Sequence, residues 1–361
     1  MMKFVYWSVR SDGPLIKKEL LLGNEESIPE PGGPEVLVRI KACGLSDVDS
    51  ELLQALGQTR QEVPCGLQIA GIVTKVGSSA TRFSVGDDVV GLLPMDTSSS
   101  GCAEYCNVNE NYLVIKPEKV SYRDAASCAG EGLKMYTALR YLGHLQGGET
   151  ILIMDGARPA GYIGIQLAQG WGAKVITTAA SEEERSFLEN IKPELTRVID
   201  ASGSKRFAIL NECLEDTGGL GVDCILDNGV NMYPNEMDEE GSKSPRSKRK
   251  CDLPEKHEVI SALGVGGRWI TSQRDLQLDP PDSRLLQLKG ASVCFLNEAT
   301  WTLSSHKLGK YLHILKDIMA KLHQGLLRPP VVTSIALEDV PHKYLDLLSS
   351  AGCKKIVMEM K

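Results

Sequence analysis

Hydrophobic positions in the first third of the chain alternate with polar ones, as they do in half-buried β-strands. In residues 31–44 (PGGPEVLVRIKACG) the apolar side chains of Val36, Val38 and Ile40 recur at every second position. Residues 70–92 contain two further runs of this kind, joined through Gly77 and a Gly-Asp turn at residues 86 and 87. The pattern in residues 1–122 therefore predicts short strands that form an irregular β-barrel.

From about residue 123 the pattern changes to short apolar runs that alternate with helical segments. The runs that fit buried parallel strands are residues 149–154, 174–179, 196–200 and 222–227. After the first run, Ile163, Leu167 and Trp171 recur at four-residue spacing, as on one face of a helix. Strands and helices in this alternation predict an α/β fold with a parallel, doubly wound Rossmann sheet.

Local signals mark the limits of the helices in this region. Ser181 and Glu184 have the spacing of a capping box, so we expect a helix to begin there and to be ended by Pro193. A further helix, closed by glycine, is expected at residues 204–219. Residues 257–264 and 267–272 predict one more helix and one more strand.

Residues 231–256 (NMYPNEMDEEGSKSPRSKRKCDLPEK) interrupt this alternation with a polar segment that is first acidic and then basic. Its composition predicts a disordered surface insertion. The alternative is that its basic cluster serves as a localisation or docking patch, tuned by modification at Ser244 or Ser247. The basic residues in question are Arg246, Lys248, Arg249 and Lys250.

The tail of the chain, residues 326–361, returns to a strand, helix, strand pattern. We expect it to rejoin the N-terminal part. The predicted domains are therefore residues 1–122 plus 326–361, which form a discontinuous unit, and residues 123–325, which contain the insertion.

Composition narrows the function classes. At 361 residues, with 42% hydrophobic and 24% charged residues, the chain is an ordinary globular protein of two-domain size. A formal net charge of -7 argues against a nucleic-acid-binding surface over the whole protein. No run approaches the roughly 18 apolar residues of a membrane span, and the N-terminal residues lack a signal-peptide pattern. The ten cysteines lack paired spacing, so we expect a cytoplasmic protein.

Residues 155–164 (DGARPAGYIG) stand where a Rossmann unit binds the pyrophosphate of a dinucleotide. Glycines permit the tight turn, and the helix that follows offers unpaired N–H groups to the phosphates. Gly156, Gly161 and Gly164 are present, but Arg158 and Pro159 occupy the middle of the turn. Proline removes one donor, and a positive φ at an arginine would cost about 1 kcal/mol. Arg158 could instead pair with a phosphate and compensate in part.

The choice of dinucleotide depends on the next strand end, residues 177–181 (TTAAS). An NAD-binding unit would carry a carboxylate there for the ribose hydroxyls, and none stands before Glu182. Thr178 and Ser181 leave room for a 2′-phosphate, which Arg185 could neutralise. If a dinucleotide binds, this pattern favours NADPH over NADH; the alternative is that Arg185 is only a solvated helix residue.

Five stretches together resemble the zeta-crystallin/quinone oxidoreductase branch of the medium-chain dehydrogenases. They are EVLVRIKACGLSDVD, AGIVTKVG, GDDVVG, GCAEY and ETILIMDGA, and the similarity extends over nearly the whole chain outside the insertion. The resemblance implies a GroES-like catalytic domain and a Rossmann domain. It also implies NADPH-dependent reduction of a quinone in the cleft between them, in a homodimer or homotetramer.

The same resemblance indicates an enzyme without zinc. Zinc alcohol dehydrogenases of this superfamily carry a Cys ligand at the place of Ser46 and a His ligand at the place of Leu67. They also have a lobe of four closely spaced cysteines, whereas Cys102 and Cys106 stand alone here. Without thiolate and imidazole ligands, nothing would hold the metal.

Further candidate residues follow from the resemblance alone. Ser46 corresponds to a residue on the nicotinamide side of the cleft, and Glu51 stands on or beside the place of the family's cleft tyrosine. Thr137 corresponds to the family's TA motif beside the cofactor, with helix packing as the alternative. Phe295 corresponds to the point where a late strand meets the nicotinamide, with a buried core position as the alternative. The predicted cofactor-binding residues are Thr137, Gly156, Arg158, Ala160, Gly161, Thr178, Ser181, Arg185 and Phe295.

Two functional hypotheses remain open from the sequence. Hydride transfer to a quinone or activated carbonyl needs no acid–base pair from the protein, and we find no firm catalytic residue. The first hypothesis is therefore an NADPH-dependent oxidoreductase with a small-molecule substrate. The second is a degenerate relative that keeps the fold and acts as a nucleotide-binding or scaffold protein, because both the glycine turn and the cleft tyrosine are altered.

Overall fold

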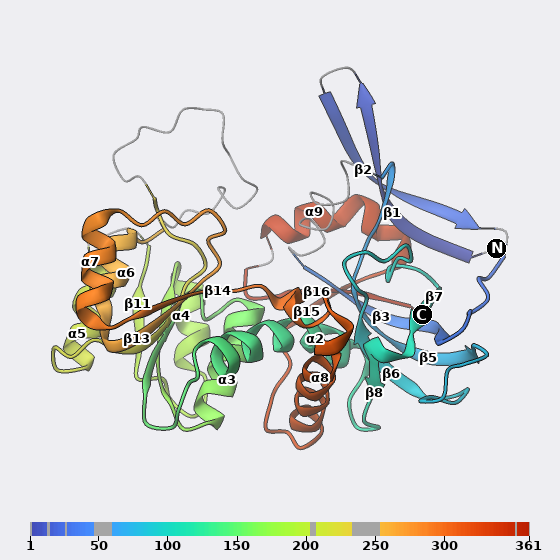
Figure 1. Ribbon diagram of the computed structural model, residues 1–361. Coiled ribbons are helices and arrows are strands. Elements are labelled where there is room, and N and C mark those ends of the chain that lie inside the picture. Colours follow the sequence, from blue (N-terminus) through green and yellow to red (C-terminus); the bar gives the residue numbers. More distant parts are fainter. Residues whose placement is uncertain are drawn as a thin grey trace. The chain divides into compact units, whose positions relative to one another are not determined.

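The computed structural model describes residues 2–12, 15–25, 27–46, 60–202, 207–232, 253–350 and 352–360 (Figure 1). The chain forms two compact units. The first unit is Met1–Leu133 with Ala299–Lys361, and the second unit is Lys134–Glu298. The predicted sites at Glu51 and in the basic cluster of the insertion lie outside the described residues.

The first unit is built on a curved sheet with the strand order β15-β16-β3-β5-β6-β8, and β7 pairs with β3 beside this path. The strands are β3 (Glu35–Leu45), β5 (Gln68–Val76), β6 (Asp88–Leu92), β7 (Tyr105–Asn109), β8 (Leu113–Ile115), β15 (Val332–Ile335) and β16 (Lys355–Glu359). Val36, Val38 and Ile40 of β3 are buried, as their alternation predicts. The central strand β3 pairs antiparallel with β5, β7 and β16.

A second, smaller sheet of the first unit contains the N-terminal hairpin. Strands β1 (Met2–Asp12) and β2 (Leu15–Glu25) pair antiparallel, and β4 (Glu62–Pro64) pairs with the other edge of β1. Helices α8 (Leu308–His323) and α9 (Val340–Ser350) belong to this unit, as does α2 (Tyr122–Tyr136) up to Leu133.

The two units divide after Leu133 and before Ala299, whereas the sequence pattern places the boundaries at 122/123 and 325/326. The difference comes from α2 and α8, which follow and precede the strand-rich segments but pack on the sheet of the first unit. Tyr311 of α8 is fully buried, and its hydroxyl donates to the carbonyl of Tyr112 and accepts from the N–H of Leu92, each at 2.8 Å. A Cβ on Gly132 of α2 would lie 2.9 Å from Ile318 of α8.

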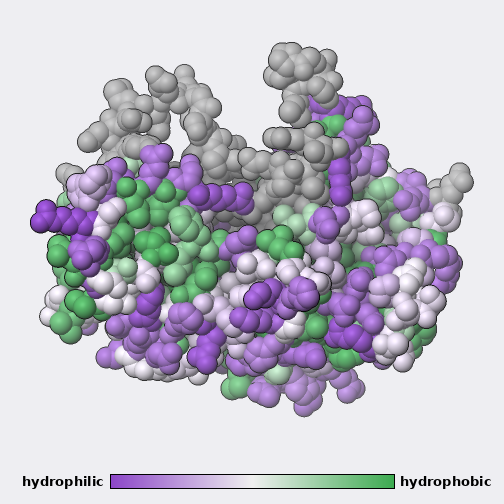
Figure 2. Space-filling model, viewed as in Figure 1, coloured by the Kyte–Doolittle hydropathy of each residue, from purple (hydrophilic) through white to green (hydrophobic). Residues whose placement is uncertain are grey.

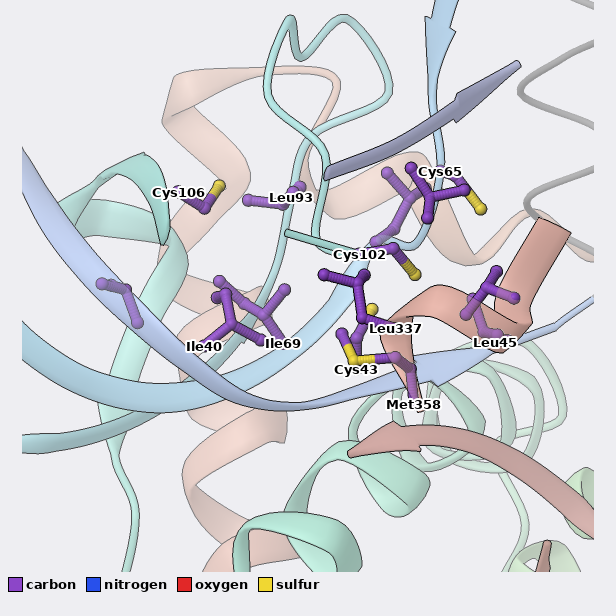
Figure 3. Packing of buried hydrophobic residues seen from close by; sticks show 14 of the residues in the cluster. Ile40, Cys43, Leu45, Cys65, Ile69, Leu93, Cys102, Cys106, Leu337 and Met358 are labelled. Atoms are coloured by element: carbon purple, nitrogen blue, oxygen red, sulfur yellow. The ribbon is translucent and has the colours of Figure 1, made fainter. Parts of the chain in front are cut away.

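Three cysteines lie together in the core of the first unit (Figure 3). Cys43, Cys65 and Cys102 are each fully buried. A Cβ on Gly66 would lie 2.5 Å from the Cys43 sulfur and 2.8 Å from the Cys102 sulfur, so this segment approaches the thiols through a glycine. Hydrogen bonding with Cys43 and then with Cys65, together with burial, raises the pKa of the Cys102 thiol well above its ordinary value. The Cys102 thiol therefore stays protonated. The three cysteines pack as small apolar core residues.

The second unit contains a fully parallel six-stranded sheet with the order β11-β10-β9-β12-β13-β14, which confirms the predicted doubly wound sheet. The strands are β9 (Thr150–Ile153), β10 (Lys174–Ala179), β11 (Arg197–Asp200), β12 (Val222–Leu226), β13 (Leu263–Thr271) and β14 (Ser292–Phe295). The helices are α3 (Pro159–Gly170), α4 (Glu182–Glu189), α5 (Ala208–Asp216), α6 (Lys256–Ala262) and α7 (Pro280–Lys289). Helices lie on both faces of this sheet (Figure 1).

Two helix limits differ from those predicted. Ile163 and Leu167 are buried on α3, but Trp171 is the C-cap residue and lies beyond the helix. Helix α4 begins after the Ser181 cap as predicted, yet it ends at Glu189 with Asn190 as the C-cap, ahead of Pro193. The N–H of Ile191 then donates to the carbonyl of Leu188, and Ile191 is buried, so the chain already turns back toward the sheet before the proline is reached.

The ends of the insertion are joined in the structure. The N–H of Asn231 donates to the carbonyl of Pro254 at 2.8 Å, and Asn231 forms an isolated bridge with Glu255. The described residues on the two sides of the insertion therefore lie next to each other, a few residues after the end of β12. None of the helices in the described ranges is long and apolar enough to cross a membrane.

Candidate functional site

The centre of the parallel sheet contains a topological switch point. The chain runs from β9 outward to β10 and β11 on one side, then returns to β12 on the other side of β9. Connections that leave β9 and β12 in opposite directions create a crevice at their carboxyl ends, where doubly wound proteins bind ligands. The turn from β9 to α3 and the residues after β12 form this end of the second unit.

Glycines let the turn, the sheet and helix α3 approach one another closely. A Cβ on Gly156 would stand 1.9 Å from the Thr177 hydroxyl oxygen of β10, and a Cβ on Gly161 would stand 2.4 Å from the carbonyl oxygen of Asp155. Gly164 leaves room for the Met135 sulfur, which would lie 2.8 Å from such a Cβ. A Cβ at Gly161 would force the backbone of the turn to shift and one at Gly156 would displace Thr177, whereas one at Gly164 would require only the flexible Met135 side chain to move.

Helix α3 begins directly at this turn without a side-chain cap. Arg158 is the N-cap residue, Pro159 is the first helical residue, and the first intrahelical bond runs from the Tyr162 N–H to the Arg158 carbonyl at 2.8 Å. The N–H groups of Ala160 and Gly161 precede that bond and point out of the helix end. Such donors, with the positive end of the helix dipole, fit a pyrophosphate group. Arg158 has a φ of -66°, so the arginine does not introduce the backbone strain considered from the sequence.

The left-handed position of the turn falls on Asp155 instead, with a φ of 55°. Its N–H donates to the Thr178 hydroxyl of β10 at 2.9 Å. Its carboxylate accepts a hydrogen bond from the side-chain amide of Asn228, which follows β12. Asp155 therefore joins the ends of three strands, with its carboxylate on the β12 side of the turn. Sequence reasoning missed both Asp155 and Asn228; the place of Asp155 directly after the strand was the available signal.

The strand end predicted to hold the 2′-phosphate is partly occupied by local interactions. Thr178 is 3% exposed and accepts from the Asp155 N–H, and Ser181 caps α4 by accepting from the Glu184 N–H at 3.2 Å. The Arg185 guanidinium pairs with Glu189 at 3.1 Å, and this hydrogen bond raises the pKa of Arg185 further above its ordinary value. The first turn of α4 also carries three successive carboxylates, Glu182–Glu184.

Thr137 and Phe295 occupy contrasting environments in the second unit. Thr137 is fully buried and begins a π-helical segment, η2 (Thr137–Leu142), that continues from α2. Segments of π-helix are frequent at functional sites. Phe295 ends the edge strand β14 and is 56% exposed, so the alternative of a buried core aromatic is wrong. Figure 2 shows hydrophobic residues gathered over the part of this unit where α7 and β14 lie.

In the first unit, the half-buried Ser46 is hydrogen-bonded to a network of buried polar side chains. With its amide oriented to satisfy its neighbours, Gln68 accepts from the Ser46 hydroxyl at 3.2 Å and from the Lys355 ammonium at 3.3 Å, and donates to a carbonyl of α2. Lys355 also forms an ion pair with Glu131. Sequence reasoning included Ser46 but missed the pair, whose partners lie 224 residues apart.

Ser46 and Leu67 stand where the family resemblance places the Cys and His ligands of zinc alcohol dehydrogenases. Within the described ranges, no group of three or more His, Cys, Asp or Glu side chains is placed to hold a metal ion.

Comparison with known proteins identifies the family. Residues 32–133 match the Alcohol dehydrogenase GroES-like domain. The chain is 47% identical over 305 residues to quinone oxidoreductase-like protein 1 of Mus musculus, and the match covers 84% of this chain and 85% of that protein. The chain belongs to the quinone oxidoreductase-like branch of the medium-chain dehydrogenase/reductase family.

Two further relatives of this quinone oxidoreductase-like chain extend the similarity to its full length. The quinone oxidoreductase of Sus scrofa is 25% identical over 348 residues, which are 94% of this chain and 92% of that protein. A mycobacterial protein solved in complex with NADPH has a TM-score of 0.75 at 21% identity, over 100% of both chains. The predicted GroES-like domain and Rossmann domain are therefore confirmed, and the family is one of oxidoreductases that use a nicotinamide cofactor.

Proposed function

We propose that this protein reduces a quinone or an activated carbonyl with NADPH, by direct hydride transfer and without zinc. The observation that carries the proposal is the uncapped start of α3 at the switch point of the sheet, in a chain of the quinone oxidoreductase-like family. Bound NADPH would supply the hydride. The N–H groups of Ala160 and Gly161 would bind its pyrophosphate, and Arg158 would supply a counter-charge.

The preference for NADPH over NADH rests on the end of β10 and on Arg185. Residues 177–181 present no carboxylate to the ribose hydroxyls. The Arg185 side chain is 41% exposed, so it can exchange Glu189 for a phosphate without being drawn out of a core. The negative charges of Glu182 and Glu183 would repel the 2′-phosphate of NADPH. The preference for NADPH therefore depends on the positive charge of Arg185.

The proposed reaction does not need a side chain that acts as a general acid or base. A reduced quinone takes its protons from water, so the protein has to orient the acceptor and exclude competing reactions. The Ser46 hydroxyl donates a hydrogen bond to the side-chain oxygen of Gln68, which orients it. Ser46 would therefore present an oxygen acceptor to a bound ligand and would position it rather than protonate it.

A second candidate is a relative that binds nucleotide without turnover. Two observations favour it: Pro159 removes one N–H donor from the helix start, and Asp155 adds a carboxylate to the turn. Under this hypothesis the fold would serve as a nucleotide-binding or scaffold protein.

Titration of the purified protein with NADPH, followed by nucleotide fluorescence and then by NADPH oxidation after addition of a quinone, tests both candidates. Binding with quinone-dependent oxidation supports the reductase. Binding without oxidation supports the second candidate. Absence of binding at millimolar NADPH contradicts both the reductase and a nucleotide-binding role without turnover.

We also infer a small-molecule partner, a cytoplasmic location and a homodimer or homotetramer. Among the described residues, β14 is the outermost strand of its sheet and Phe295 is exposed; this supports self-association, because such a strand edge can pair with a second copy. A sedimentation experiment that finds only monomer at micromolar concentration would contradict this inference.

A further inference from the structure

The turn that receives the pyrophosphate in this fold carries a negative charge of its own. Asp155 lies in this turn, two residues after β9 ends at Ile153, and its carboxylate accepts from the Asn228 amide beyond β12. That hydrogen bond lies across the switch point, the position where a ligand enters the crevice. Asp155 is partly buried, and its side chain lies at the carboxyl end of the sheet, where this fold binds ligands.

We propose that the carboxylate of Asp155 is an affinity-determining group that weakens dinucleotide binding to this chain. The proposal rests on the proposed function, because it assumes that the pyrophosphate lies at the start of α3. A pyrophosphate carries two negative charges at neutral pH, and like charges a few ångströms apart repel one another. The helix N-terminus and Arg158 attract the same group, so the affinity is the balance of these opposing contributions.

The backbone around Asp155 keeps the carboxylate in place. Its N–H is held by the Thr178 hydroxyl at 2.9 Å, and its carbonyl accepts from the Arg158 N–H at 3.0 Å. A φ of 55° is unfavourable for most residues but is tolerated by aspartate and asparagine. The acid therefore cannot turn away without the loss of the contact to Asn228.

The substitution Asp155→Asn removes the charge and little else. Asparagine adopts the left-handed conformation at least as readily, and its side-chain oxygen can accept from Asn228 as the carboxylate does. A matched control is Glu194→Gln, which removes one charge at the amino end of β11, where Glu194 is exposed beside Lys192. The control reports the effect of net charge alone.

The experiment measures the Kd of NADPH by nucleotide fluorescence for the full-length wild-type protein, Asp155→Asn and Glu194→Gln, with the melting temperature of each as a check on folding. We expect Asp155→Asn to tighten binding about fivefold to tenfold and Glu194→Gln to change it less than about twofold. The ratio of the wild-type and Asp155→Asn constants should fall toward one as salt is raised, because salt screens the repulsion.

The outcomes separate this proposal from the proposed function. If wild-type protein binds NADPH and Asp155→Asn binds it no more tightly, the proposal is overturned and the reductase stands. If only Asp155→Asn binds, the proposal is supported and the wild-type chain is not an NADPH reductase. If neither binds, the carboxylate is not what limits affinity, and both are overturned. Should Asp155→Asn melt well below the wild type, Asp155→Ser provides a second removal of the same charge.

Discussion

Lys355 of β16 and Glu131 of α2 form an ion pair inside the first unit, where their side chains are 2% and 11% exposed. The pair links the last strand of the sheet to a helix more than two hundred residues earlier in the chain. Because both charges are removed from water, each depends on the other.

We expect Lys355→Met to lower the free energy of unfolding by about 3 kcal/mol or more, because Glu131 would be left in the core without its cation. The double variant with Glu131→Gln should recover much of that loss. The exposed pair of Lys343 and Asp339, with side chains 57% and 44% exposed, provides the control. Lys343→Met should cost less than about 1 kcal/mol in the same denaturant titration. Equal losses for the two lysine variants would show that the buried pair has no special role.

Gly161→Ala should destabilise the second unit and weaken NADPH binding together. The new Cβ would stand 2.4 Å from the Asp155 carbonyl, so the turn must shift, at a cost of about 1 to 3 kcal/mol. Gly170→Ala, in the same helix, meets nothing within 4 Å and should be neutral or slightly stabilising. Thermal unfolding and the Kd of NADPH give the two measurements. Unchanged stability and affinity in Gly161→Ala would mean that the turn has room that the structure does not show.

Arg185→Glu should raise the Kd of NADPH about tenfold while it changes that of NADH less than about twofold. The reason is that only NADPH carries the 2′-phosphate that this guanidinium would neutralise. Arg197, which is paired with acidic side chains of α5, provides a comparison, because Arg197→Gln should leave the preference unchanged. An unchanged NADPH/NADH ratio in Arg185→Glu would remove the basis for the cofactor assignment.

Glu258→Gln should alter the pH dependence of stability. Glu258 of α6 accepts from the N–H groups of Ile209 and Leu210 at the start of α5, and burial raises the pKa of its carboxyl above its ordinary value. The folded state therefore holds the proton more tightly than the unfolded chain, and the stability from this group is complete below about pH 4 and is lost as pH rises through the folded pKa.

The glutamine side chain accepts the same hydrogen bonds without a charge, so the stability of Glu258→Gln relative to the wild type should rise between pH 4 and pH 7. Denaturant titrations at several pH values measure this difference. A relative stability that falls over that range would reverse the assigned direction of the pKa shift.

Much of the fold follows from local patterns. The apolar runs that become β9, β10, β11 and β12 are short and bounded by helix signals, and parallel strands buried on both faces have this character. The alternation in β3 likewise reports one buried face. The boundaries of the units could not be obtained in this way, because the helical pattern of α8 does not reveal which sheet its apolar face covers.

The candidate site could be predicted only where it depends on the backbone. Gly156 and Gly161 follow from the need for close approach, and both are found in tight contact. The partner of Asp155 lies 73 residues away, at the end of another strand, so no spacing rule indicates it. The exposure of Phe295 could not be predicted either. An aromatic residue in an apolar strand suggests a core position, but β14 lies at the edge of its sheet and the Phe295 side chain is exposed.

The pairing of β16 with β3 has a consequence for biosynthesis. Residues 355–359 complete a sheet whose central strand is translated some three hundred residues earlier, whereas the second unit is one continuous segment, Lys134–Glu298. During translation the second unit can fold as soon as it leaves the ribosome. Until residues 355–359 have been synthesised, the edge of β3 that pairs with β16 stays exposed. We therefore expect chaperones to bind mainly the N-terminal segment of the first unit during synthesis.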